Sequence, residues 1–142
     1  MTIHQLSIFI ENHSGTLVKV LNALKKANIQ IIASTIADTT EYGIYRVICS
    51  EPLRAYEELK KTGITVTVSD VLALKLDNKP GHAAAAISTF SEAGIGIAYM
   101  YSFLLGGRGI LVFRTDNSER AFEIIQQNNL KYITEEDLSI LT

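Results

Sequence analysis

The sequence has one cysteine, Cys49, and no long apolar run. A lone cysteine cannot form an intramolecular disulfide, which favours a reducing compartment. No apolar stretch approaches the roughly 20 residues that a membrane-spanning helix needs. The opening segment MTIHQLSIFIE lacks the basic region and the apolar core of a signal peptide. We therefore expect a soluble cytoplasmic protein with no membrane partner.

The sequence also has no large excess of positive or negative charge. The 142 residues carry a formal net charge of −2, with 47% hydrophobic and 20% charged residues. This composition is typical of a globular chain with a core and excludes a disordered one. Without a basic field, the chain is not expected to bind nucleic acid or anionic lipid. The length suits one ordinary domain or two very small ones.

The sequence offers no recognisable catalytic or metal-binding pattern. No nucleophile is accompanied by a base and an orienting partner. The glycine-rich segment LLGGRGI at 104–110 lacks the features of a phosphate-binding loop, and its position between two predicted strands indicates a mobile hairpin. We expect no catalytic residue, no metal and no cofactor. The possible metal ligands His4, His13, His82 and Cys49 do not have the spacing of a known metal site.

The chain repeats itself without a gap at an offset of 66 positions, which places Gly15 on Gly81. Glycine, apolar and helix positions stay in step over the whole unit, which chance would not produce. We infer two tandem units, near 1–69 and 70–142. The matched pairs include Leu6 with Leu72, Asn12 with Asn78, Ala27 with Ala93, Ile31 with Ile97, and Arg54 with Arg120.

Each unit is predicted to have the order β-α-β-β-α-β. Within residues 6–10 and 72–76, leucine or isoleucine stands at every second position, which is typical of strands with one face inward. A helix with one apolar stripe follows in each unit. The later strands are IQIIASTIA and GIYRVICS in unit one and IGIAYMYSF and GILVFRT in unit two. The second helices are EPLRAYEELKK and NSERAFEIIQQ, and ITVTV and KYITEE close the units.

No glycine- and serine-rich linker separates the units, because TVTVSDVLALKL runs from one into the next. Flexibly tethered domains normally have a polar spacer. Units of about 70 residues also gain stability from a shared interface. We therefore expect two units packed side by side as one rigid body.

Charges that recur on the second helices are assigned to the surface. Glu57 and Glu123 follow Arg54 and Arg120 by three positions, as expected for charge pairs on an outer helical face. Such pairs contribute about a few tenths of a kcal/mol each. We expect them to stabilise the helices and to take no part in catalysis.

The two segments that open the first helices carry a family resemblance. DNKPGHAAAAISTFSEAGIGI at 77–97 resembles the first loop, helix and second strand of the ACT domain, a small ferredoxin-like ligand-binding fold. ENHSGTLVKVLNALKKANIQI at 11–31 resembles a second copy, with Ser14 where the family often has proline. Together the copies cover essentially the whole chain, which is similar to a stand-alone tandem ACT protein.

The resemblance implies an α+β fold in which two ferredoxin-like units lie side by side. Their antiparallel sheets would form one continuous eight-stranded sheet with helices on one face. A small effector, commonly an amino acid, would bind where the first loop of one unit faces the second strand of its neighbour. The resemblance therefore implies a regulatory or sensory protein and not an enzyme. Its partners would be a free amino acid, a regulated enzyme or regulator, and a second copy in a homodimer.

The second loop, DNKPG, is chemically suited to such a ligand. Gly81 allows close approach of the backbone, and Pro80 fixes its direction. The helix that follows presents N–H groups at 80–83 and the positive end of its dipole, which favours a carboxylate. Asn78 offers a donor and an acceptor, and Asp77 offers a counter-charge for an ammonium group. Alternatively, these two side chains only cap the turn or the helix.

The two predicted sites are not equivalent, because Gln30 offers a side-chain hydrogen bond and the matching Gly96 does not. The stronger site joins the second loop to unit one: Asn78, Lys79, Pro80, Gly81, His82 and Ala83 with Gln30, Ile31, Ile32 and Ala33. The weaker site joins the first loop to unit two: Asn12, His13, Ser14, Gly15, Thr16 and Leu17 with Ile97, Ala98 and Tyr99.

Two other interpretations remain open. The chain could be a protein-interaction or oligomerisation module whose ligand sites have decayed. It could also bind RNA on a ferredoxin-like sheet through Phe9, Tyr45 and Phe113, although no basic surround accompanies these residues.

Overall fold

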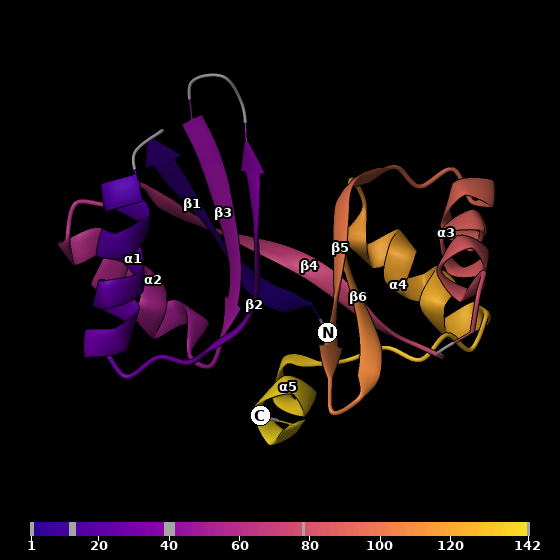
Figure 1. Ribbon diagram of the computed structural model, residues 1–142. Coiled ribbons are helices and arrows are strands. Elements are labelled where there is room, and N and C mark those ends of the chain that lie inside the picture. The colour runs from indigo at the N-terminus through magenta and orange to yellow at the C-terminus, as the bar shows by residue number, and fades with distance from the viewer. Residues whose placement is uncertain (1, 12–13, 39–41, 78, 142) are drawn as a thin grey trace. The chain divides into compact units, whose positions relative to one another are not determined.

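The computed structural model describes residues 2–11, 14–38, 42–77 and 79–141 (Figure 1). The chain forms two compact units. The N-terminal unit comprises His4–Ser69, and the C-terminal unit comprises Asp70–Thr142 together with Met1–Ile3. One strand, β4, begins in the N-terminal unit and ends in the C-terminal unit.

The N-terminal unit has the order β-α-β-β-α-β. Its strands are ordered β2-β3-β1-β4, and β3 is antiparallel to both β1 and β2. Figure 1 shows the two helices on the same face of these strands. The elements are β1 (Ile3–Glu11), α1 (Ser14–Lys26), β2 (Ile31–Asp38), β3 (Tyr42–Cys49), α2 (Pro52–Lys61) and β4 (Val66–Leu76).

The core of the N-terminal unit follows from the period-two pattern of β1. Leu6 and Ile8 are fully buried, and Ile10 is 7% exposed. Val20 and Leu24 of α1 pack against them in the same cluster. Pro52 stands in the first turn of α2, where its missing N–H has no cost. The apolar stripe of the helix and the inward face of the strand thus form one core.

The C-terminal unit repeats this plan. Its strands are ordered β4-β6-β5, with antiparallel pairing throughout. Figure 1 shows α3 and α4 on one face of these strands. Phe90 and Phe113 belong to the buried core of this unit, with ring centroids 5.0 Å apart. None of the helices described is long and apolar enough to cross a membrane. The elements are α3 (His82–Glu92), β5 (Ile97–Leu105), β6 (Arg108–Thr115), α4 (Ser118–Gln127) and α5 (Glu135–Leu141).

The repeat is visible in the backbone where each helix ends. Asn28 and Gly94, which are 66 positions apart, both have positive φ, at 57° and 76°. Gly63 and Asn129 form a second such pair, at 80° and 52°. A left-handed residue just after a helix is a common terminator, and glycine and asparagine tolerate it best. The two units therefore share backbone geometry as well as sequence pattern.

The predicted ferredoxin-like α+β fold is confirmed, but the described residues form six strands where we expected eight. ITVTV and the following VLALKL belong to one strand, β4, which continues through Ser69 and Asp70 without a turn. KYITEE contributes only an isolated bridge between Tyr132 and Leu74. This short segment still occupies the position of a closing strand, because the Lys75 N–H donates to the Lys131 carbonyl at 2.8 Å. The equivalent bond in the N-terminal unit runs from the Phe9 N–H to the Thr65 carbonyl at 2.9 Å.

The helix α5 was not predicted. It is seven residues long and begins with a reciprocal capping arrangement. The Asp137 N–H donates to Thr134 Oγ1 at 3.1 Å, and the Thr134 N–H donates to Asp137 Oδ2 at 2.9 Å. Leu138 is 2% exposed, so the helix buries an apolar side chain as well. The cap and this buried leucine fix a helix that is too short to be stable alone.

Candidate functional site

The predicted ligand loop of the C-terminal unit lies between β4 and α3. The Lys79 N–H donates to the Asp77 carbonyl at 2.8 Å, which closes a tight turn. The Asp77 N–H donates to His82 Nδ1 at 2.6 Å, so the imidazole ties the end of the strand to the start of the helix. Asp77, Lys79 and Pro80 are exposed, and His82 is half-buried. Asn78, the remaining residue of the loop, lies outside the described residues.

The N-terminus of α3 has no side-chain cap among the residues described. Gly81 is the cap residue and has a left-handed backbone, with φ of 83°. Proline has no N–H, and the His82 N–H already donates to the Lys79 carbonyl at 3.3 Å. Residues 80–83 thus have three N–H groups, and no described residue accepts those of Gly81 and Ala83. The dipole of the 11-residue helix favours an anion at this end.

A small hollow lies beside this loop within the C-terminal unit. Its volume is about 130 Å³, and Asp77 and His82 line it together with the end of β4 and the segment Asn129–Lys131. Ala86 of α3 closes one wall. The hollow places the exposed Asp77 and the half-buried His82 at one concave surface.

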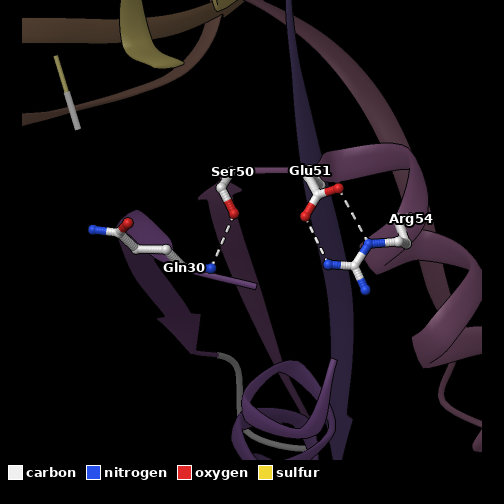
Figure 2. A network of polar contacts seen from close by, with 4 residues as sticks. All are labelled: Gln30, Ser50, Glu51 and Arg54. Carbon is white, nitrogen blue, oxygen red and sulfur yellow. Dashed lines mark hydrogen bonds and ion pairs between the residues drawn. The ribbon is translucent and has the colours of Figure 1, made fainter. Parts of the chain in front are cut away.

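The predicted strand residues belong to the N-terminal unit. The Gln30 N–H donates to Ser50 Oγ at 3.0 Å, which fixes the backbone just before β2 (Figure 2). The Gln30 amide group points away from Ser50 and is exposed. Gln30, Ile31 and Ser50 line a hollow of about 490 Å³ against α1. Ile32 is half-buried, and Ala33 is 9% exposed and belongs to the core.

The matching position of the C-terminal unit, Gly96, makes an equivalent backbone contact. Its N–H donates to Asp116 Oδ1 at 3.3 Å, and Asp116 is the repeat equivalent of Ser50. A Cβ at position 96 would lie 3.1 Å from Asp116 Oδ2, which is tighter than an ordinary contact. A side chain at position 96 would therefore require Asp116 to shift by a few tenths of an ångström. Neither Ser50 nor Asp116 was predicted to support the strand.

The residues of the weaker predicted site are only partly described. Asn12 and His13 lie outside the described residues, and Ser14 is the first residue of α1. Gly15 is exposed and lines a hollow of about 480 Å³ with the outer face of α1. The other members lie on α1 and at the start of β5: half-buried Thr16, Leu17, Ile97 and Tyr99, and exposed Ala98. The predicted joining of each loop to the strand of the other unit stays a prediction for both sites.

The charge pairs on the second helices differ from the prediction in one unit. Arg120 Nη1 lies 3.0 Å from Glu123 Oε2, as predicted. Arg54 pairs with Glu51 at 2.6 Å and not with Glu57, because Glu51 precedes α2 and meets the guanidinium with both oxygens (Figure 2). The hydrogen bond from Arg54 and then its charge hold the pKa of Glu51 below its ordinary value.

The aromatic positions considered for RNA binding do not form an exposed platform. Phe113 is fully buried and Tyr45 is 6% exposed, with its hydroxyl donating to Ser34 Oγ at 3.0 Å. Phe9 is 41% exposed and stacks on Tyr42. Sheet alternation directs two of the three rings into the cores, so this interpretation is wrong for them. Among the described residues, no group of three or more histidine, cysteine or acidic side chains is placed to hold a metal ion.

Comparison with known proteins adds a family to this geometry. A family model described as an ACT domain pair matches residues 1–142. The crystal structure of protein BT0572 from Bacteroides thetaiotaomicron is 36% identical in sequence, with a TM-score of 0.92 over 98% of this chain and 96% of that one. A comparison with curated proteins gave no match.

Two more distant solved structures share the fold. The ligand-free regulatory subunit of aspartate kinase from Thermus thermophilus is 15% identical, with a TM-score of 0.63 over 87% of this chain and 91% of that one. E. coli aspartokinase III in complex with lysine and aspartate is also 15% identical, with a TM-score of 0.54 over 92% of this chain and 32% of that one. At this identity the likeness extends to the fold alone.

The family match spans the same two repeats that the 66-residue offset predicts, and the backbone turns recur at the same offset. Each repeat opens its first helix directly after a strand, as the resemblance in the loops implies. The chain belongs to the ACT domain family, as a pair of ACT domains in tandem.

Proposed function

We propose that this protein is a regulatory sensor of a free amino acid and not an enzyme. The observation that carries the proposal is the start of α3. No described side chain caps this helix, and Gly81, which has no side chain, leaves its backbone accessible. Such an end offers unpaired N–H groups and a positive dipole. The carboxylate of an amino acid complements both.

The ammonium group of the same ligand has a counter-charge within the loop. Asp77 is exposed and lines the small hollow beside α3. The 2.6 Å hydrogen bond between the Asp77 N–H and His82 Nδ1 holds the aspartate near the first turn of the helix. A zwitterion would thus meet a negative side chain and a positive helix end in one loop. Asn78 and Gln30 remain the sequence-based candidates for further hydrogen bonds.

The family and its solved members support this proposal. One fold relative is a complex with lysine and aspartate, and another is a regulatory subunit of aspartate kinase. We propose the same kind of role here: occupancy by an amino acid changes how the protein acts on a partner enzyme, a regulator or a second copy of itself. The first loop, with Ser14 in place of proline, would form a weaker or differently selective site.

A thermal-shift screen of the common amino acids tests the proposal directly. A ligand present at about 100 times its dissociation constant adds about 2.7 kcal/mol to the stability of the folded state. We expect one amino acid or a few related ones to raise the melting temperature, with calorimetry confirming the heat of binding. If no amino acid gives a shift or a heat, the sensing proposal is wrong.

A matched pair of variants separates sensing from the alternative of a pure interaction module. Asn78→Ala changes the second loop, and Asn12→Ala makes the same change at the repeat-equivalent position of the first. We expect Asn78→Ala to weaken amino-acid binding by about tenfold, the loss of one charged hydrogen bond, and Asn12→Ala to have a smaller effect. Partner binding that persists in both variants, with no amino-acid response in the wild type, would favour the interaction module.

A further inference from the structure

A larger cavity adjoins the small hollow beside α3 in the C-terminal unit and shares Lys75, Leu130 and Lys131 with it. Its volume is about 750 Å³, and it is bounded by the tip of the β5–β6 hairpin, the end of β4 and the segment that precedes α5. Figure 1 shows α5 near this end of the hairpin. Small-molecule sites in proteins typically occupy about 300–1,000 Å³, so the cavity is large enough for an organic ligand.

Three cationic side chains line this cavity, from three different segments: Lys75 of β4, Arg108 of β6, and Lys131 before α5. None of the three forms an ion pair with any residue that the structure describes. Asp137 supplies the acidic side chain of the lining, and its Oδ2 accepts the Thr134 N–H at 2.9 Å. The lining therefore carries a formal surplus of two positive charges.

The two lysines are neighbours across a strand pairing. The Lys75 N–H donates to the Lys131 carbonyl at 2.8 Å, beside the bridge between Leu74 and Tyr132. Like charges opposite each other in antiparallel pairing destabilise a sheet. On the other side of Lys75, the register places Ile110, which is 1% exposed and also lines the cavity. The two lysine side chains therefore border an apolar part of the cavity lining.

The N-terminal unit shows that the fold does not require these cations. At an offset of 66, its equivalents of Lys75, Arg108 and Lys131 are Phe9, Tyr42 and Thr65. The backbone there is the same, because the Phe9 N–H donates to the Thr65 carbonyl at 2.9 Å. Phe9 and Tyr42 stack with ring centroids 4.7 Å apart. One corner of the repeat thus packs two rings where the other gathers three positive charges.

We propose that the cavity of the C-terminal unit binds a small organic anion with two negative charges. Arg108 and the two lysines would neutralise its charged groups, since guanidinium and ammonium donors favour carboxylate and phosphate oxygens. The apolar side chains Leu105, Ile110, Leu130 and Ile133 would contact its carbon skeleton. The ligand relieves the repulsion between Lys75 and Lys131. The cavity shares Lys75, Leu130 and Lys131 with the small hollow beside α3, but Asp77 and His82 line only that hollow. The dianion proposal does not depend on the proposed amino-acid function.

Titration of the full chain with defined probes tests the site. Phenyl phosphate and phenylsuccinate are dianions near pH 7.5, where a phosphate with a second pKa of about 6 is ionised. Two compounds serve as controls: phenylacetate carries one negative charge, and benzyl alcohol carries none. We expect at least one dianion to bind more tightly than both controls and to shift the backbone amide NMR signals of Lys75, residues 105–110 and residues 130–137. Which dianion binds more tightly tells a phosphate ligand from a dicarboxylate.

A charge-matched pair of double variants provides the control. Arg108→Gln with Lys131→Gln removes two cations of the cavity, and Lys19→Gln with Lys26→Gln removes two from the exposed face of α1. We expect the first to weaken dianion binding by at least about tenfold and the second to leave it unchanged. The first variant should also unfold at no lower temperature, because a repulsion is removed.

Three results would overturn the proposal: no binding of either dianion at millimolar concentration, equal loss of binding in both variants, or NMR shifts confined to residues outside this lining. The NMR map of the wild-type protein decides the question even if a variant fails to fold.

Discussion

Gly15 and Gly81 occupy equivalent positions of the two units, yet only Gly81 has a left-handed backbone, with φ of 83°. Gly81 precedes α3, whereas Gly15 lies in the first turn of α1. Among the residues described, a Cβ would meet no heavy atom beyond its immediate chain neighbours within 4 Å at either position. Backbone conformation alone therefore decides what an alanine does at each.

The two alanine variants are expected to change stability in opposite directions. Gly81→Ala forces an L-residue into the left-handed region and should lower the free energy of unfolding by about 1–2 kcal/mol. Gly15→Ala should raise it by up to about 1 kcal/mol, because alanine restricts the unfolded chain and suits a helix. Urea unfolding of both variants measures the difference. The same sign in both would contradict the assigned backbone geometry.

The side chains that support the second strand of each unit provide another matched test. Ser50 Oγ accepts the Gln30 N–H, and Asp116 Oδ1 accepts the Gly96 N–H. Ser50→Ala and Asp116→Ala should each lower the free energy of unfolding by about 0.5–1.5 kcal/mol, the usual net value of one hydrogen bond. Ser102→Ala, on the exposed face of β5, is the control and should change it by less than about 0.5 kcal/mol. Chemical denaturation of the three variants checks the order.

Most of the fold could be predicted from the sequence, because the strands and helices carry strong periodic patterns. Leu6, Ile8 and Ile10 show the strand period, and the repeat at an offset of 66 presents the strand and helix patterns a second time. The segment KYITEE closes the unit as predicted, but it does so as an isolated bridge and not as a full strand. The extent of this pairing depends on partners distant in sequence, which leave no local pattern. The helix α5 did leave a signal, since Thr134 and Asp137 have the spacing of a capping box.

The candidate site was less predictable than the fold. The loop at 77–82 could be located, because glycine and proline before a helix have few backbone options. The bond from the Asp77 N–H to His82 Nδ1 and the support of Gly96 by Asp116 depend on side-chain placement after folding. The cationic cavity leaves no local sequence pattern, because Lys75, Arg108 and Lys131 are far apart in sequence. Its one signal is the contrast between these cations and their uncharged equivalents in the first repeat.

Removal of the cap of α5 is expected to destabilise the C-terminal unit. Thr134 and Asp137 exchange two hydrogen bonds at the start of this seven-residue helix. Thr134→Ala should lower the free energy of unfolding by about 0.5–2 kcal/mol. Thr134→Ser should keep most of the stability that the cap contributes, because serine also caps helices. Hydrogen exchange of the α5 amides measures the local loss. Equal protection in the alanine and serine variants would show that the cap does not hold the helix.

The ion pair of Glu51 with Arg54 gives stability a dependence on pH. The hydrogen bond from Arg54 and its charge hold the pKa of Glu51 below its ordinary value of 4.5. A carboxylate with a lower pKa in the folded state stabilises that state above its unfolded pKa. The contribution is lost as the pH falls through the folded pKa. Both side chains are about half exposed, at 55% and 43%, so salt should weaken the effect.

Glu51→Gln tests this dependence, with Glu57→Gln as the control from the same helix region. At low salt and about pH 7, we expect Glu51→Gln to melt below the wild-type protein, and this difference to shrink as the pH falls through the lowered pKa of Glu51 in the folded state. Glu57 forms no ion pair with the residues described, so its variant should show no such pH-dependent difference. Melting curves at several pH values measure both. A deficit of Glu51→Gln that persists at acidic pH would assign the effect to the shape of the helix start and not to the charge pair.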